Sequence, residues 1–170
     1  DNGKHMKAWE QSDRKILHLL QKNSREKLES IAFDTGLSVA TVQRRIKHFR
    51  TVGIIERETA LISQDAAGYN MTFLIFVEME QEKSHQLDLF RKKILAEAQV
   101  QQCYYITGEA DFALVVLGKD VEDYEHLTRR LFFEDSNVKR FRTSVVMNRT
   151  KTGMNVPLEC MEENITPTPR

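Results

Sequence analysis

The sequence predicts an α+β fold in which a winged-type helix-turn-helix domain precedes a ferredoxin-like β-α-β-β-α-β domain. Three observations predict it. Residues 12–53 repeat apolar side chains at helical spacing around a short turn. Residues 70–148 switch between strand and helix patterns. Residues 1–60 hold 12 Lys and Arg against 8 Asp and Glu, and the remainder holds 13 against 17, which indicates two modules with different partners.

Composition excludes several classes of protein. A hydrophobic content of 41% with 7 Gly and 3 Pro in 170 residues favours a globular chain over a disordered one. No apolar run reaches the length of a membrane span, and no secretory signal is visible. The two cysteines lie far apart in the sequence, which favours a reducing cytoplasm. Cys103 and Cys160 form no C-x-x-C pattern, so neither a metal site nor a disulfide framework is expected, and no cofactor motif is present. Residues 1–6 are interpreted as an expression scar.

Three helices are predicted in the basic part. Ser12 and Ser38 are candidate N-caps, and Gly36 supplies the positive φ that ends the second helix. Each helix has one apolar face with i, i+3, i+4 or i+4, i+7 spacing. These faces are Ile16, Leu19 and Leu20; Leu28, Ile31 and Ala32; and Val42, Ile46 and Phe49. The short turn before the third helix gives the helix-turn-helix arrangement.

The outer face of the third helix carries cations and no acid. Small side chains at Ala40 and Thr41 let its N-terminal end approach DNA closely, and Gln43 and Arg44 can reach base edges. Arg45 and Lys47 can neutralise phosphates. The DNA-binding candidates are Ser38, Ala40, Thr41, Gln43, Arg44, Arg45 and Lys47. The cations alone fit a solvated helix face equally well, but the turn spacing favours DNA.

The acidic part alternates strands and helices. Strands are expected at 70–81, 100–108, 111–118 and 138–148, with helices at 85–98 and 121–135. The inward-facing residues are Phe73, Ile75, Val77 and Met79; Leu87, Phe90, Ile94 and Leu95; and Tyr124, Leu127 and Leu131, with Phe141, Thr143, Val145 and Met147 alternating along the last strand. Leu74 and Phe76 make the first strand apolar on its other face as well. A second subunit is therefore expected to cover that face, which predicts a homodimer.

Three stretches occur in an order that resembles a known family: "LESIAFDTGLSVATVQRRIKHFRTVGII", "ETALISQDAAGYNMTFLIFVEM" and "CYYITGEADFALVVLGKDVEDYEHL". From about residue 12 to 159 the chain is similar to the Lrp/AsnC (feast/famine) transcription regulators, including their T-G-x-x-D-[FY] hairpin. The resemblance implies an operator-binding regulator that forms dimers and further tetramers or octamers, with an amino-acid-sensing second domain. It also matches the family's turn to Leu37-Ser38 and its characteristic arginine to Arg45.

The resemblance further implies an effector site at the hairpin. The implied residues are Thr107, Gly108, Glu109, Ala110, Asp111 and Phe112, completed by Thr143, Ser144 and Val145. Gly108 would allow a ligand close to the backbone, turn amides would hold its carboxylate, and Asp111 would pair with its ammonium group. Without the resemblance, the same residues indicate an ordinary hairpin turn. The connection "EDSNVKRF" departs from the Pro-Gly pair frequent in relatives.

The expected organisation is a helix-turn-helix domain at 7–54, a linker strand at 55–69, a sensing and dimerisation domain at 70–159, and a flexible tail at 160–170. Two other functions stay open. One is a sirohaem-decarboxylase-like enzyme, suggested by the cations at 44–47 with His48. The other is a metabolite-binding oligomeric module without DNA binding. No cluster of catalytic groups is recognisable in the second domain, so we expect no enzyme.

Overall fold

The structure, a computed structural model, describes residues 9–158. The expected scar at 1–6, Cys160 and the expected tail at 160–170 lie outside the described residues. The described chain divides into two compact units. The first comprises residues 9–60 together with 153–158, and the second comprises residues 61–152.

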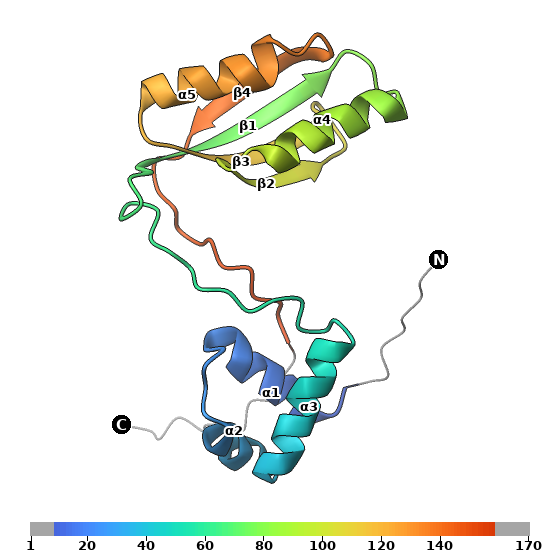
Figure 1. Cartoon of the computed structure of the whole chain (residues 1–170), viewed down its shortest axis with the longest axis vertical. Coiled ribbons are helices and arrows are strands. Elements are labelled where there is room, and N and C mark those ends of the chain that lie inside the picture. The colour runs from blue at the N-terminus through green and yellow to red at the C-terminus, as the bar shows by residue number, and fades with distance from the viewer. Residues whose placement is uncertain (1–8, 159–170) are drawn as a thin grey trace, which may run out of the picture. The chain divides into compact units, whose positions relative to one another are not determined.

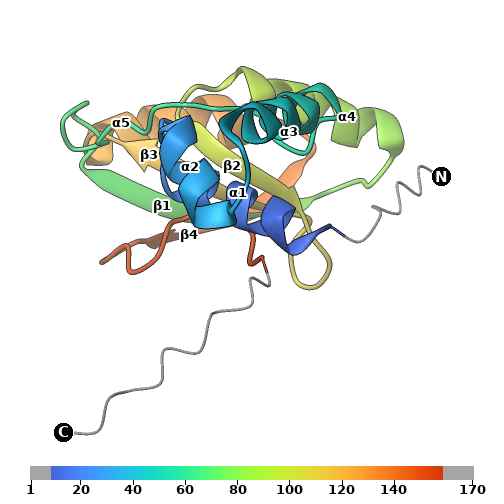
Figure 2. The same cartoon turned by 90° about the horizontal axis from the view of Figure 1, so that it is seen from below.

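The first unit is built from three helices (Figure 2): α1 (Gln11–Lys22), α2 (Leu28–Thr35) and α3 (Val39–Thr51). Their apolar faces meet in a single core, as the spacing predicted. The buried members are Ile16, Leu17, Ile31, Ala32, Val42, Ile46 and Phe49. Trp9 packs against this core from the segment that precedes α1.

The turn between α2 and α3 confirms two sequence predictions. Gly36 ends α2 at φ 67°, in the left-handed region that glycine adopts without strain. Ser38 caps α3 by accepting a hydrogen bond from the Thr41 amide at 3.2 Å. The prediction for Ser12 is wrong, because α1 begins at Gln11 with Glu10 at its N-cap. The Ser12 hydroxyl instead accepts a hydrogen bond from Arg45.

The second unit contains one sheet and a helical layer: β1 (Met71–Met79), α4 (Ser84–Ala96), β2 (Val100–Tyr105), β3 (Phe112–Gly118), α5 (Val121–Thr128) and β4 (Val138–Val145). A π-helical turn, η1 (Arg129–Phe133), extends α5. The strand order is β2-β3-β1-β4, and every neighbouring pair is antiparallel. This confirms the β-α-β-β-α-β prediction. Figure 1 shows α4 and α5 over the same face of the sheet.

The covered face of the sheet holds the core of the second unit. Alternate residues of β1 and β3 point into it, together with apolar residues of α4, α5 and η1. The core consists of Phe73, Ile75, Val77, Met79, Leu87, Phe90, Ile94, Phe112, Leu114, Val116, Leu127, Leu131 and Phe132. The prediction for Leu95 is wrong, since its side chain is 85% exposed. Leu95 lies one residue beyond Ile94 and is thus rotated out of the stripe that faces the sheet.

The opposite face of the sheet is open in this chain. Leu74 and Phe76 of β1 lie on it and are 38% and 36% exposed. Their neighbours in register are Val115 and Ala113 of β3, and Tyr104 of β2 lies beside Ala113. An apolar strip therefore runs across β2, β3 and β1, and Ser144 and Arg142 of β4 border it. We call this surface the open face.

Two segments of chain connect the units. The linker (residues 52–70) follows α3, and the return segment (residues 146–158) follows β4. The linker contains no strand, so the expected linker strand and β-wing are not formed. Its hydrogen bonds are local instead, with a turn at 63–68 and a two-point contact between Arg50 and Glu58. The return segment ends in the first unit, whereas the sequence placed residues up to 159 in the second domain.

Residues 9–158 include no helix that is both long enough and apolar enough to cross a membrane.

Candidate functional site

The outer face of α3 presents its polar residues to solvent. Val42, Ile46 and Phe49 anchor the opposite face in the core and fix the rotation of the helix. The side chains of Ala40, Gln43, Arg44 and Lys47 are exposed, as predicted, and Thr41 is half-buried beside Ser38. Within residues 9–158, neither Arg44 nor Lys47 forms an ion pair. Both cations are therefore available to an outside anion.

Arg45 lies in a different environment. Its guanidinium group donates to Asp13 at 2.6 Å, to Glu10 at 2.8 Å and to the Ser12 hydroxyl at 2.8 Å. The hydrogen bond to Asp13, and then that to Glu10, raise the pKa of Arg45 above its ordinary value. The sequence predicted that Arg45 neutralises phosphate, and that stays a prediction; in this chain its guanidinium group is occupied by the start of α1. Its fork geometry is used to join α3 to the start of α1.

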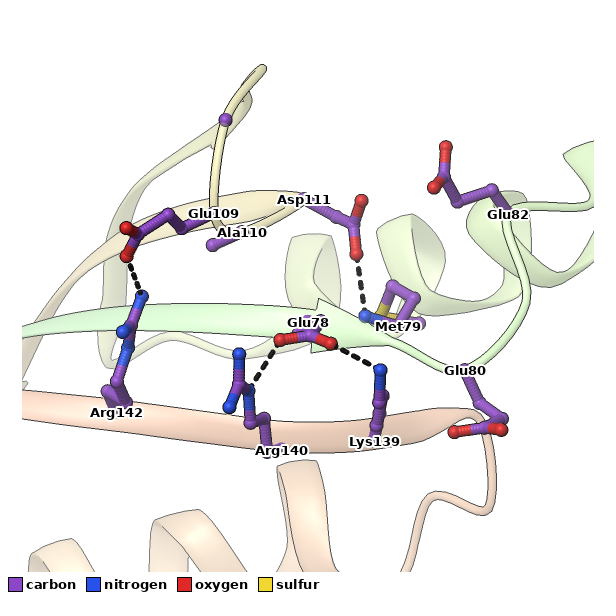
Figure 3. Close-up of a pocket in the computed structure, with 11 residues that line it drawn as sticks. Glu78, Met79, Glu80, Glu82, Glu109, Ala110, Asp111, Lys139, Arg140 and Arg142 are labelled. Atoms are coloured by element: carbon purple, nitrogen blue, oxygen red, sulfur yellow. Dashed lines mark hydrogen bonds and ion pairs between the residues drawn. The ribbon is translucent and has the colours of Figure 1, made fainter.

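A second charged site lies at the end of the sheet where β1 finishes and β4 begins (Figure 3). It is an open cleft of about 740 Å³. Its lining residues are Glu78, Met79, Glu80, Glu82, Gly108, Glu109, Ala110, Asp111, Lys139, Arg140 and Arg142. Acidic groups come from β1, the connection to α4 and the β2–β3 loop, and all three cations come from β4. We call this site the sheet-end cleft.

Ion pairs cross the cleft from β4. Lys139 contacts Glu78 at 2.6 Å, and Arg140 contacts the other oxygen of the same carboxylate. Arg142 contacts Glu109 on the β2–β3 loop at 3.2 Å. The hydrogen bond from Lys139, followed by that from Arg140, lowers the pKa of Glu78, and Glu78 in turn raises the pKa of Lys139. The cleft therefore holds carboxylates and cations side by side.

A β-bulge explains why two consecutive residues reach one carboxylate. Glu78 pairs with Arg140, whereas the next residue, Met79, pairs with Val138. Lys139 is thus the extra residue of β4, and the local twist of the bulge brings it to the same side as Arg140. Sequence reasoning missed these cations and Glu78. Regular alternation would have pointed Lys139 and Arg140 to opposite faces, although it places Arg140 and Arg142 together.

Four of the predicted effector residues line the cleft: Gly108, Glu109, Ala110 and Asp111. Gly108 has φ 118°, as the loop requires. One carboxylate oxygen of Asp111 accepts a hydrogen bond from the Met79 amide at 2.6 Å, and the Asp111 amide donates to the Val77 carbonyl at 2.9 Å. Asp111 therefore anchors the loop to the end of β1 while it contributes negative charge to the cleft.

The other predicted effector residues do not line the cleft. Phe112 is 1% exposed and belongs to the core, and the Thr143 hydroxyl is bonded to Tyr124 on the helical side of the sheet. Thr107, Ser144 and Val145 are exposed outside it. The alternation of β4 separates Thr143 and Val145 from Arg140 and Arg142, because successive side chains point to opposite faces.

The residue that precedes β4 is bonded to the segment that follows β1. Asn137, which is 7% exposed, donates from its side-chain amide to the Gln81 carbonyl and accepts from the Gln81 amide, both at 3.1 Å. Its carbonyl also accepts from the Glu80 amide at 2.8 Å. These bonds fix the start of β4 against the end of β1, from which the charged side chains project.

Comparison with known proteins agrees with this architecture. The AsnC-type helix-turn-helix domain matches residues 11–50, and the Lrp/AsnC ligand binding domain matches residues 72–156. An HTH-type transcriptional regulator of Sinorhizobium fredii is 40% identical over 150 residues, which are 88% of this chain and 89% of that protein. One from Haemophilus influenzae is 33% identical over 153 residues, or 90% and 91%.

Solved structures share the fold. A transcriptional regulator from Neisseria meningitidis in complex with L-Met superimposes with a TM-score of 0.84 at 24% identity, covering 89% of this chain and 97% of that one. The two matched domains occur in the order that the fold shows. The chain therefore belongs to the Lrp/AsnC family of helix-turn-helix transcriptional regulators.

Proposed function

We propose that this regulator binds operator DNA as a homodimer through α3, and that an amino acid in the sheet-end cleft changes that binding. The observation that carries the proposal is the combination of opposite charges in the cleft. A free amino acid has one carboxylate and one ammonium group, and both need partners of opposite charge within a few ångströms. Arg140 and Arg142 offer the first kind of partner, and Glu109 and Asp111 offer the second.

Binding requires little disruption of the cleft. The side chains of Arg142 and Glu109 are 54% and 84% exposed, and such exposed ion pairs contribute only about 0–1 kcal/mol. An amino acid can separate this pair and satisfy each member with its own opposite charge. L-Met is present in the Neisseria meningitidis regulator, so it is the first effector to test here.

DNA recognition is assigned to the outer face of α3. Gln43 and Arg44 are placed to read base edges in the major groove, and Lys47 to contact phosphate. Ser38, Ala40 and Thr41 are small residues at the N-terminal end, where the helix would come nearest to the duplex. Arg45 supports the recognition helix through α1 and does not contact the DNA.

The open face supplies the dimer contact. Its apolar strip would be covered by the same strip of a second copy, since a two-fold interface brings one patch against itself. Phe76 and Arg142 are neighbours in register, so a second copy would lie beside the sheet-end cleft. Two copies of α3 would then read half-sites separated by about 34–36 Å or a multiple of it. Tetramers or octamers would need further surfaces.

The test is a mobility-shift titration on the DNA upstream of the protein's own gene, at two salt concentrations. Arg44→Ala should weaken binding by about 1–3 kcal/mol for each half-site. Lys47→Ala should lower the salt slope by about one unit for each phosphate that the lysine neutralises. Lys92→Ala, an exposed cation on α4, is the matched control. Equal binding by all variants would remove α3 from the interface, and no salt-sensitive binding would favour a DNA-independent binding module.

The effector is tested with L-Met and then with a mixture of the common amino acids. Asp111→Asn is the informative variant, because the asparagine oxygen can still accept the Met79 hydrogen bond while the negative charge is removed. We expect normal basal DNA binding and a reduced effector response. A response equal to that of the wild type would place the effector outside the sheet-end cleft.

A further inference from the structure

The return segment docks on the helix-turn-helix unit through one glutamine. The Gln21 side chain accepts a hydrogen bond from the Val156 amide at 2.7 Å and donates one to the Val156 carbonyl at 3.1 Å. Both backbone groups of one residue are thus paired, as they would be in a β-ladder. Two residues later, Leu158 packs against the core of the first unit. Docking therefore combines two hydrogen bonds with apolar contact.

The other end of the return segment lies at the C-terminal end of β4, whereas the sheet-end cleft lies at the N-terminal end of the same strand. The return segment continues directly from β4, the strand that carries Lys139, Arg140 and Arg142. Where it leaves the sheet, the Val146 amide donates to the Thr72 carbonyl at 2.9 Å. Further along, Arg149 donates to Gln64 of the linker at 2.6 Å, and Gln64 donates to Thr72 at 3.2 Å. The segment is consequently held at both ends, by β1 and the linker at one end and by α1 at the other.

The helix that receives the return segment also holds the recognition helix. Gln21 lies in the last turn of α1, and Asp13 in its first turn binds Arg45 of α3. A helix is a rigid element over this length, so its two ends move together. The return segment is therefore bonded to β1 and the linker within the second unit, and to α1, which holds Arg45, within the first. The covalent chain joins these two sets of contacts. The linker, which leaves α3 directly, is the second covalent connection between the units, and Arg149 contacts it at Gln64.

We propose that Gln21 is a positioning residue for the regulatory response, and that the docked return segment transmits the state of the sheet-end cleft to α3. When a shift of β4 draws the return segment tight, either α1 moves with the segment or Val156 leaves Gln21. Those docked and undocked arrangements are the two states that a ligand can bias. The proposal rests on the proposed effector function, because it needs a ligand that acts at the cleft.

The test measures docking and regulation separately in the full chain. Exchange of the Val156 amide with deuterium reports docking, because Gln21 is its acceptor. Operator affinity with and without the amino-acid mixture reports regulation. Gln21→Ala removes both hydrogen bonds, and Lys22→Ala, an exposed neighbour at the same helix end, is the control. Allosteric responses are typically about 5–150-fold, so the disappearance of one is measurable.

We expect Gln21→Ala to speed Val156 exchange by roughly tenfold or more, as local opening becomes easier. Its basal operator affinity should stay within about twofold of the wild type, because the hydrogen bonds that join α3 to α1 remain. Its effector response should fall toward none, while Lys22→Ala behaves as the wild type does. Faster exchange with an unchanged response would overturn the proposal. Unchanged Val156 exchange would also overturn it, since Gln21 would then not hold the segment.

A wild type that responds to no amino acid would contradict the proposed effector function. Transmission between the units is then tested with operator DNA as the only ligand. Operator binding should slow exchange of the Val146 amide, at the end of β4, in the wild type but not in Gln21→Ala. If operator binding leaves Val146 exchange unchanged in the wild type, the return segment transmits nothing between the units.

Discussion

The two units differ in how completely they bury their own apolar residues. The three helices of the first unit enclose their core, and the face of α3 that remains outside is polar. The sheet of the second unit is covered by helices on one face only, and the open face keeps Leu74 and Phe76 at the surface. The first unit therefore encloses its own core and leaves a polar face for the proposed DNA contact, whereas the second leaves an apolar face that the proposed dimer would cover.

The two units also differ in whether the cations of their candidate sites are paired. Arg44 and Lys47 on α3 have no ion-pair partner within residues 9–158, whereas each cation of the sheet-end cleft contacts a carboxylate from another segment. Unpaired cations on a helix cost little to keep in water and are ready for a polyanion. Paired cations hold the cleft in shape and must exchange partners when a ligand enters. Substitutions should consequently affect binding alone in the first case and both shape and binding in the second.

The largest expected effect comes from placing a charge on the open face. Leu74→Asp should weaken dimerisation strongly, because the two-fold contact would bury a pair of unpartnered carboxylates. The dimer should be weakened by about 3 kcal/mol or more, roughly a hundredfold in its dissociation constant. Sedimentation equilibrium measures it directly.

Leu95→Asp makes the same chemical change on α4, where the native side chain is already 85% exposed, and serves as the control. It should leave the dimer intact. Two variants that dimerise equally well would show that the open face is not the interface.

The next effect separates two adjacent arginines. Arg45→Ala should lower the free energy of unfolding of the first unit by about 1–3 kcal/mol, because it leaves Asp13 without its partner. Arg44→Ala should change stability by no more than about 0.5 kcal/mol. Trp9, the single tryptophan, packs on this core, so its fluorescence during urea unfolding follows this unit.

Arg45→Lys completes the experiment, since it keeps the charge but cannot reach three oxygens with a planar fork. An intermediate stability would support the geometric role of Arg45. If Arg44→Ala were the more destabilising change, the two side chains would have been assigned to the wrong faces of α3.

The contrast between units also explains which features the sequence predicts. The faces of α1, α2 and α3, the cap at Ser38 and the turn at Gly36 depend on residues within a few positions of one another, and all were predictable. The covered face of β1 follows from alternation, and the succession of strands and helices follows from the switch between the two periodicities. These signals are local, and regular geometry carries them directly into the fold.

The features that were missed join distant positions. Glu78 contacts residues of β4 only because a bulge shifts the register there, and alternation cannot reveal a bulge. Arg45 is separated from Asp13 by 32 positions, and Gln21 from Val156 by 135. Sequence periodicity predicts only that these polar side chains lie outside the apolar face of their helix or strand. Periodicity does not identify the distant residue that each of them contacts in the folded chain.

The smallest expected effect concerns acid. The pKa of Glu78 is lowered, first by Lys139 and then by Arg140, so the ionised carboxylate stabilises the folded state. That contribution is fully present above the ordinary carboxyl pKa of 4.5 and disappears as the pH falls through the lowered pKa. Glu78→Gln should therefore melt below the wild type near neutral pH, by about one to two degrees, and match it in acid.

Melting curves between about pH 3 and pH 7 measure the difference, and added salt should shrink it because the groups are near the surface. Glu82→Gln is the control, since Glu82 lines the same cleft but pairs with no described cation. It should follow the wild type at every pH. A Glu78→Gln difference that grows toward acid would mean that the native carboxylate is destabilised, and that the cations of β4 are held for a ligand and not for Glu78.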